Sequence, residues 1–305
     1  MQSVIPARHL LLALAVVFVW GTNFVVIRLA LDALPPLLFA TLRYLLAALP
    51  FMLLVKRPQV PWRNLAAYGV LIGVGQFGLL FIAMQRDISP GLASLVIQSQ
   101  VFFTMGMAMA LSGDRPRLFQ LVASMVAAAG MVVIAVRTDG STTLLGLVLI
   151  TLAAISWAAG NIVNRSAALA QQARGGEQLN MLAYVVWSSA FAVPPLFLLS
   201  LWFEGWPRIV EGVTQASWST WLAVLWQSYG NTIFGYGAWA WLLSRYAAAS
   251  VSPMALLVPV FGMAASALLL GEGMPGWKLL AAGLVLLGLT INVLWPHVQR
   301  RWAAR

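Results

Sequence analysis

The stretch VFVWGTNFVVIRL, residues 17–29, decides the fold class and also poses its main problem. It reads as the middle of a membrane-spanning helix, because it is too apolar and too long for one face of a surface helix. It nevertheless carries the amide of Asn23 halfway along and the guanidinium of Arg28 near its end. Both groups are costly in hydrocarbon, so their presence predicts a polar role inside the membrane.

The composition of the whole chain places it among integral membrane proteins. Hydrophobic residues make up 61% of the 305 residues and charged residues only 9%. Cysteine is absent, which excludes a disulfide framework and a thiolate metal site. The formal net charge of +10 could suggest nucleic acid as a partner. The basic residues, however, are scattered singly or in pairs between apolar runs, so we expect a lipid bilayer and no nucleic acid.

Ten apolar runs follow one another along the chain, each close to the roughly 20 residues that cross a hydrocarbon core as a helix. Pro and Gly mark most of the connections. The first run carries Asn23 and Arg28 and precedes nine others, so we interpret it as a retained helix and not as a signal peptide. The longest loops, 165–178 and 204–216, have room only for a short interfacial helix. The runs are 10–31, 37–55, 65–85, 91–112, 118–136, 144–164, 179–203, 217–243, 250–270 and 277–295.

The basic residues also predict the orientation in the membrane. With the N-terminus inside, twelve of the 18 Lys and Arg residues fall on one side and six on the other. Cytoplasmic loops carry the excess of Lys and Arg. Both termini are therefore expected to be cytoplasmic.

The opening pattern occurs a second time in the chain. Trp20 is followed eight residues later by Arg28, and Trp157 is followed eight residues later by Arg165, with an asparagine between them in each case. Residues 102–130 also align without gaps with residues 260–288, where Asp114 pairs with Glu272. The sequence therefore contains two related halves.

The repeat predicts an all-α integral membrane protein with ten transmembrane helices. Each half has five spans, an odd number, so the two halves sit in the bilayer with opposite orientation. We place the first repeat at residues 1–139 and the second at 140–305. Inverted repeats of this kind are typical of transporters, because exchanging the conformations of two similar halves exposes a central site to each side in turn.

Three short motifs occur in order along the chain. They are WGxN at Trp20, Gly21 and Asn23, LRYLLAA at Leu42–Ala48, and LxGE at Leu269, Gly271 and Glu272. Together they resemble the drug/metabolite transporter superfamily, and within it the exporters built from two EamA modules, over nearly the whole chain, about 10–136 and 144–295. Within that family the chain looks most like the YddG-type aromatic amino-acid exporters of the bacterial inner membrane. The resemblance implies export of amino acids and related metabolites.

The chain lacks the residues that an intramembrane enzyme needs. His9 and His297 are the only histidines, and both lie near the ends of the chain outside the apolar runs. No HExxH, DDxxD or cysteine is available to supply a base, a metal site or paired carboxylates at depth. We therefore expect no enzymatic activity, no cofactor and no metal.

Neutral amides near aromatic residues are the candidate substrate-binding groups. Amide and ring lining suits an amphipathic zwitterion, whose ammonium can lie over a ring while neutral dipoles bind the carboxylate. The alternative is that each amide only holds neighbouring helices together. On the eighth run, Gln227, Asn231 and Phe234 are expected on one helical face. The predicted substrate-binding residues are Trp20, Asn23, Gln76, Gln98, Trp157, Asn161, Gln227 and Asn231.

The two arginines of the first two runs differ in depth. Arg28 lies near the end of its helix, where it can reach Asp32 one turn on. Arg43 is deeper, seven residues past Pro36, and either attracts a substrate carboxylate or serves a structural or gating role.

Two further features concern motion and packing. Pro194, Pro195 and Pro259 fall within apolar runs and are hinge candidates, because each removes a backbone hydrogen bond. The fifth and tenth runs are rich in small residues, which predicts close packing at the periphery or a dimer contact. These small residues are Ala123, Ala127, Gly130, Ala281, Ala282, Gly283 and Gly288.

The middle of every apolar run lacks Asp and Glu, which bears on energy coupling. A buried carboxylate is the usual proton carrier and the usual partner of a cationic drug. We therefore expect facilitated export of a small molecule by a monomer or homodimer. The alternatives are a drug, nucleotide-sugar or other metabolite transporter of the same fold, or a proton-coupled antiporter.

Overall fold

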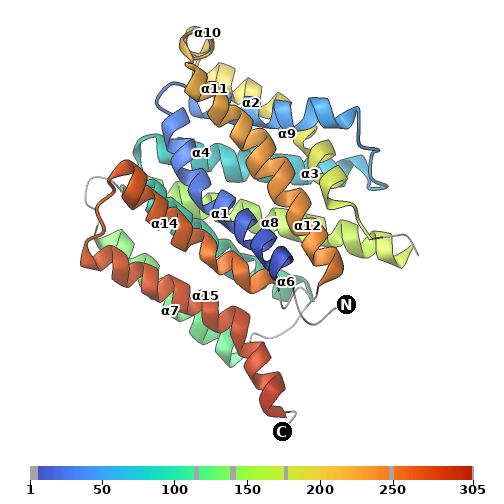
Figure 1. Ribbon diagram of the computed structural model, residues 1–305, viewed down its shortest axis with the longest axis vertical. Coiled ribbons are helices and arrows are strands. Elements are labelled where there is room, and N and C mark those ends of the chain that lie inside the picture. Colours follow the sequence, from blue (N-terminus) through green and yellow to red (C-terminus); the bar gives the residue numbers. More distant parts are fainter. Residues whose placement is uncertain (1–5, 113–116, 138–141, 175–177, 247–250, 304–305) are drawn as a thin grey trace.

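The structure is a computed structural model, and it describes residues 6–112, 117–137, 142–174, 178–246 and 251–303. The regular elements of these residues are helices (Figure 1). Six long helices are uninterrupted. They are α1 (Ala7–Ala30), α2 (Pro36–Met52), α7 (Leu118–Val136), α8 (Leu144–Ala173), α9 (Met181–Phe203) and α15 (Gly276–Ala303).

Four further helical segments are composite, because their backbone changes helix type along the way. Helix α3 (Trp62–Val70) continues through the π-helical η1 (Leu71–Gly78) into α4 (Leu79–Arg86), and α5 (Pro90–Val96) through the 3₁₀ turn η2 (Ile97–Ser99) into α6 (Gln100–Ser112). Helix α11 (Trp218–Leu225) continues through the π-helical η3 (Trp226–Phe234) into α12 (Gly235–Arg245), and the 3₁₀ turn η4 (Ser252–Leu256) leads into α14 (Leu257–Leu270).

These segments correspond to the ten predicted apolar runs. Seven helices of the described residues are long and apolar enough to cross a membrane, and Pro36–Met52 and Met254–Leu270 are shorter apolar helices. The short helix α10 (Trp206–Gln215) lies in one of the two loops expected to hold such a helix. The other loop, 165–178, is shorter than expected. The predicted run ended at residue 164, whereas α8 continues to Ala173.

Local sequence signals explain where several helices begin and end. Pro36 and Pro90 occupy the first turn of α2 and α5, where a missing N–H costs nothing. The side chains of Thr143 and Asn180 accept hydrogen bonds from the first turns of α8 and α9. Helix α14 ends at Leu270 and is followed by Gly271, whose φ of 67° lies in the left-handed region that favours glycine.

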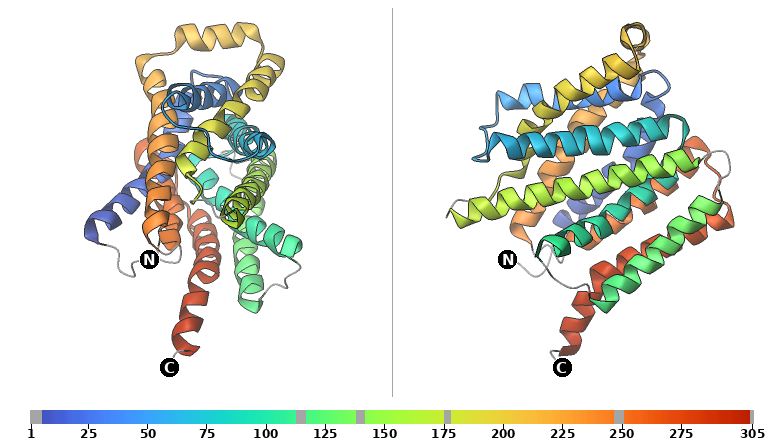
Figure 2. Two further views of the ribbon diagram at one scale, coloured as in Figure 1. Left: turned by 90° about the vertical axis from the view of Figure 1, so that its right-hand side faces the viewer. Right: turned by 180° about the vertical axis from the view of Figure 1, so that it is seen from behind.

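The helices pack as long, inclined neighbours that pair distant parts of the chain. Helix α2 lies along α9, α1 lies along α14 and α12, and α8 lies along η1 and α6. Helices α7 and α15 form a separate pair at the lower edge of the molecule (Figures 1 and 2). Each of these contacts joins an element before residue 140 to one after it.

Glycines bring α7 and α15 into close contact, as the small residues predict. A Cβ atom on Gly288 would lie 2.5 Å from the carbonyl oxygen of Ala123, and one on Gly130 would lie 2.8 Å from the carbonyl oxygen of Ala281. Gly283 is different, because it is exposed and a Cβ there would meet nothing within 4 Å. Its assignment to the packing surface was therefore wrong, since it lies on the opposite face of α15.

The hinge candidates occupy two kinds of position. Pro194 and Pro195 lie inside α9, which continues past them to Phe203. Pro259 is the third residue of α14 and follows directly on η4. Whether the helices bend at these prolines during a functional cycle stays a prediction.

We expect Gly288→Leu to destabilise the protein, because the new side chain has no space between α15 and α7. The free energy of unfolding should fall by about 1–3 kcal/mol, the usual cost of overpacking. Thermal unfolding of the purified protein in detergent measures it. Gly283→Leu is the matched control on the same helix, and equal losses in the two variants would contradict the packing.

Candidate functional site

A buried arginine lies where the helices of the two halves meet. Arg43 of α2 is 0% exposed. Its Nε and Nη2 atoms donate to the Thr232 hydroxyl of η3 at 3.3 and 3.1 Å, and its guanidinium carbon lies 3.5 Å from the centre of the Phe77 ring of η1. Its Nη1 atom has no hydrogen-bond partner, and no salt bridge joins Arg43 to a carboxylate of the described residues.

The side chain of Arg43 forms part of the wall of a small cavity. The cavity has a volume of about 10 Å³, which is room for about one water molecule. The rest of its wall comes from α2, α3, η1, α9, η3 and α12, and its polar members are hydroxyl groups. The wall consists of Arg43, Tyr44, Tyr68, Gly69, Ile72, Val185, Ser188, Ser189, Thr232 and Tyr236.

Two π-helical segments position the groups around Arg43. Their i→i+5 hydrogen bonds widen the helical turn, and such segments often mark functional sites. In η1, Gln76 precedes Phe77 and is 3% exposed, and its Oε1 atom has no partner. In η3, Gln227 is 0% exposed and neither atom of its side-chain amide has a partner among the described residues. The Gln227 carbonyl accepts a hydrogen bond from Thr232 at 2.9 Å.

The π-helical turn also corrects one expectation from the sequence. Gln227 and Phe234 were expected on one face of a regular helix. The structure buries Gln227 completely but leaves Phe234 40% exposed. The 3.6-residue periodicity does not apply through η3, because the turn there is wider.

Trp20 of α1 contacts both Asn231 of η3 and Tyr236 of the cavity wall. Its indole Nε1 donates to the carbonyl oxygen of Asn231 at 3.2 Å. Its ring packs against Tyr236 and Trp239, with centroid distances of 5.7 and 5.2 Å. Asn23 is one turn further along α1 and 3% exposed, and its Oδ1 atom has no partner. Since Tyr236 also lines the cavity, the Trp20 ring cluster and the Arg43 cavity are neighbours.

The remaining predicted amides contact neighbouring helices. The Asn161 amide of α8 donates to Gln100 Oε1 at 2.9 Å and to Thr104 Oγ1 at 3.2 Å, both on α6. The Gln98 amide donates to the Ala255 carbonyl at 3.4 Å. Trp157 is half-buried against the hydrophobic core. Asn161 and Gln98 thus hold helices together in this conformation, and their role with a substrate stays a prediction.

Sequence reasoning identified Arg43 but missed the rest of the cavity wall. None of the eight predicted aromatic and amide residues lines the cavity directly. The missed residues include Tyr44, Tyr68 and Tyr236, which are three of the six tyrosines in the chain. A phenol is a polar group that has to find a partner when it is buried. Tyrosines deep in apolar runs were therefore a usable signal.

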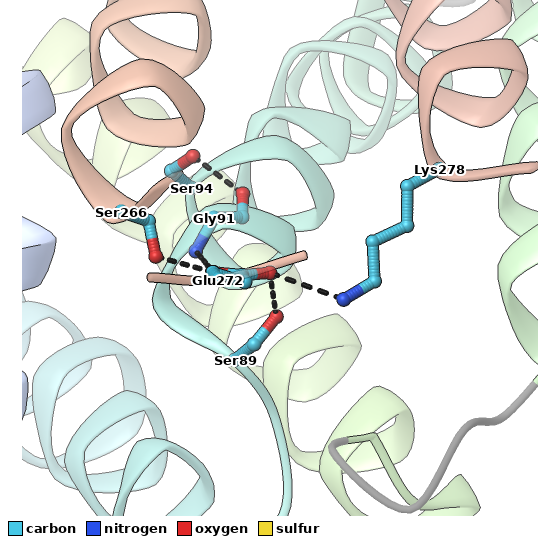
Figure 3. Close-up of polar contacts among 6 residues, drawn as sticks. All are labelled: Ser89, Gly91, Ser94, Ser266, Glu272 and Lys278. Carbon is cyan, nitrogen blue, oxygen red and sulfur yellow. Dashed lines mark hydrogen bonds and ion pairs between the residues drawn. The ribbon is translucent and has the colours of Figure 1, made fainter. Parts of the chain in front are cut away.

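A second polar cluster surrounds Glu272, immediately after α14 (Figure 3). The carboxylate accepts hydrogen bonds from the Ser89 hydroxyl at 2.5 Å, from the Gly91 N–H at 3.0 Å and from the Ser266 hydroxyl. Lys278 Nζ lies 3.3 Å away, with the lysine side chain 3% and the glutamate side chain 9% exposed. Because Gly91 is in the first turn of α5, a carboxylate of the second half caps a helix of the first half.

Glu204 makes a parallel contact at the start of α2. Its carboxylate accepts hydrogen bonds from the N–H groups of Leu37 and Leu38 at 2.6 and 3.1 Å, and from the Ser200 hydroxyl at 2.6 Å. Burial raises the pKa of Glu204, and these hydrogen bonds oppose the rise. The sequence analysis did not single out Glu204, so this capping role was missed.

The arginine near the C-terminal end of the first helix behaves as predicted. Arg28 forms an ion pair with Asp32, four residues on, and the two side chains are 36% and 61% exposed. The pair borders an open groove of about 380 Å³ that also contacts Arg86, Ser89 and Glu272.

These features define a multi-pass α-helical membrane protein whose two halves meet around buried polar groups. The sequence matches the EamA-like transporter family over residues 7–136 and 144–294. The chain belongs to this family. It is a membrane transporter and not an enzyme.

Relatives with curated names agree with the family. A "Probable amino-acid metabolite efflux pump" of Salmonella typhimurium is 41% identical, over 95% of this chain and 96% of the relative. The protein of the same name from Escherichia coli K12 is 40% identical, over 92% and 93%. An "Uncharacterized inner membrane transporter YedA" of Escherichia coli K12 is 26% identical, over 97% and 94%.

A solved structure supports the fold alone. The chain titled "Crystal structure of protein" matches with a TM-score of 0.61 at 18% sequence identity, and the match covers 95% of this chain and 99% of that one.

We expect Glu272→Gln to destabilise the protein, because it removes the carboxylate that faces the buried Lys278. Breaking a buried ion pair costs about 3–5 kcal/mol. Thermal unfolding of the purified variant in detergent measures the loss. The double variant Glu272→Gln with Lys278→Met should recover part of the loss. Asp32→Asn, which breaks the exposed pair with Arg28, is the control and should cost no more than about 1 kcal/mol. Equal losses for the two single variants would contradict a stabilising role for Glu272.

Proposed function

We propose that the protein exports amino acids, most readily aromatic and other amphipathic ones, from the bacterial cytoplasm. The observation that carries this proposal is the neighbourhood of a buried arginine, neutral amides and aromatic rings where α1, α2, η1 and η3 meet. Such lining suits a small zwitterion with an apolar side chain. The names of the Salmonella typhimurium and Escherichia coli relatives, each a "Probable amino-acid metabolite efflux pump", support the same substrate class.

We further propose that the two halves, 1–139 and 140–305, are inverted five-helix repeats that provide alternating access. The pattern of helix contacts supports this. Exchanging the halves converts the contact of α1 with α14 into that of α8 with α5–α6, and the contact of α1 with η3 into that of α8 with η1. The α2–α9 and α7–α15 pairs map onto themselves. With both termini cytoplasmic, as the basic residues predict, α1 would lead from the cytoplasm outward.

Charge placement supports facilitated export without proton coupling. The carboxylates of the described residues lie in turns, at helix ends or in the short helix α10, and the long helices carry none in their middle turns. They are Asp32, Asp87, Glu204, Glu211 and Glu272. A proton-coupled antiporter needs a titratable group that alternates between the two sides. Of the alternative substrates, a cationic drug fits less well, because no carboxylate of the described residues lines the Arg43 cavity.

Efflux from cells tests the substrate class. Bacteria that express the chain and are loaded with an aromatic dipeptide should release more free aromatic amino acid than empty-vector cells. Asn23→Ala and Trp157→Ala should each lower this release about fivefold, the effect of losing roughly 1 kcal/mol of hydrogen bonding or of ring contact. Trp202→Ala is the matched control, since Trp202 is 84% exposed.

Two results would contradict the proposal in different ways. Release equal to that of empty-vector cells, at normal expression, would remove the substrate class. Undiminished release by both variants would leave the class standing but would remove Asn23 and Trp157 from the site.

An imposed pH gradient tests the energy coupling. In proteoliposomes, uptake of a zwitterionic amino acid should follow its own gradient and change less than about twofold when a pH gradient is added, because no carboxylate of the described residues lies in the middle turns of a long helix. Valinomycin with potassium holds the membrane potential at zero as the control. A large acceleration under these conditions would establish proton coupling instead.

A further inference from the structure

We infer that Arg43 and the hydroxyl-lined cavity beside it bind the carboxylate of the transported substrate. The inference rests on the proposed transport function and assigns one part of the substrate to one place. It also decides between the two roles that the sequence left open for Arg43.

Arg43 is charged, and no carboxylate of the described residues neutralises it in a salt bridge. A guanidinium stays protonated in proteins, so Arg43 brings a full positive charge into a fully buried position. Burying a charge is costly unless an opposite charge compensates it. No carboxylate of the described residues forms a salt bridge with Arg43. A site with a buried cation and no counter-charge of its own is suited to an anionic ligand group.

The contacts of Arg43 orient its guanidinium but leave one donor free. Thr232 accepts from Nε and Nη2, and the guanidinium carbon lies over the Phe77 ring, 3.5 Å from its centre. These contacts hold the guanidinium in one orientation. They leave Nη1 without a partner. A guanidinium presents its donors as a planar fork that matches a carboxylate, so an oriented fork with a free donor is a binding element as well as a structural one.

Two hydroxyl groups of the cavity wall also lack a close hydrogen-bond partner. The Ser188 hydroxyl is buried without a partner. The Tyr44 hydroxyl makes only a long contact of 3.5 Å with the Ile72 carbonyl. Both lie in the same wall as Arg43. Neutral hydroxyl donors of this kind can bind the second oxygen of a carboxylate without adding charge.

The Trp20 ring cluster lies beside the cavity, where the ammonium and side chain of the substrate can bind. Tyr236 lines the cavity and also packs against Trp20, which lies 5.2 Å from Trp239 between ring centres. An ammonium group is repelled by Arg43 and attracted to ring faces. An amino acid with its carboxylate at Arg43 can therefore direct its ammonium and side chain toward the Trp20 cluster. The ligand class is an α-amino acid with a free carboxylate.

The cavity is too small for a carboxylate as it stands, at about 10 Å³. Binding therefore requires the wall to move apart, and Arg43 links α2 of one half to η3 of the other through Thr232. The free Nη1 donor would then bond to the substrate carboxylate, while Thr232 keeps the guanidinium oriented.

The experiment compares an amino acid with its amide, in which a neutral NH2 group replaces the charged carboxylate oxygen. Wild-type proteoliposomes are first screened with a panel of labelled amino acids. For the best substrate, unlabelled amino acid and its amide then compete for uptake. We expect the amino acid to compete roughly tenfold or more better than the amide, the ratio typical of one charge-assisted hydrogen bond. Arg43→Gln should bring this ratio close to one.

The controls keep the test decisive. Arg63→Gln, at an exposed position of α3, should keep the wild-type ratio. If Arg43→Gln does not fold, Thr232→Val replaces it, because it keeps the charge and removes the acceptor that orients it. In that variant a reduced ratio supports the inference and an unchanged ratio overturns it.

Failure of this inference differs from failure of the proposed function. Wild-type uptake with no preference for the free carboxylate, or an Arg43→Gln variant that keeps the preference, overturns the carboxylate site and leaves amino-acid transport standing. Absence of uptake for every amino acid of the panel overturns the proposed function, and the carboxylate site with it.

Discussion

The buried guanidinium of Arg43 is the constraint on which the centre of the structure depends. A charge in that position has to be surrounded by groups that lower its cost, and each neighbour contributes in a different way. Phe77 supplies a ring face and Thr232 supplies a hydroxyl acceptor. Both belong to π-helical turns, η1 and η3, which come from different halves of the chain. The widened turns and the buried arginine are therefore parts of one arrangement, in which irregular backbone lies inside the protein, where neighbouring groups can satisfy it.

Hydrophobicity and length predicted most of the helical fold, because a span has to be both apolar and about 20 residues long. The small residues of runs 118–136 and 277–295 predicted their close contact, and α7 and α15 do pack together. The π-helical turns were not predictable in this way. They preserve length and composition and change only the backbone hydrogen bonding, so the facing of Gln227 and Phe234 was misjudged.

The candidate site was predictable only where a residue was costly by itself. Arg43 and the deep amides were noticed because each is expensive in hydrocarbon. The cavity wall was missed because Tyr68, Ser188 and Tyr236 come from three different helices and become a site only when those helices meet. Glu272 was used as a motif residue without a partner, since its contact with Gly91 spans more than 180 residues of sequence. Single-residue cost can be read from a sequence, whereas convergence depends on the packing.

The two ends of the molecule hold the halves together by different chemistry, which matters for the proposed alternating access. At one end, Glu272 and Glu204 of the second half cap α5 and α2 of the first half with charge-assisted hydrogen bonds. At the other end, Asn64 bonds to the Val163 carbonyl and to the Tyr184 hydroxyl, all neutral groups. Hydrogen bonds that involve an ionised group are roughly twice as strong as neutral ones. Separation of the halves at the Asn64 end would therefore break weaker hydrogen bonds than separation at the Glu272 end.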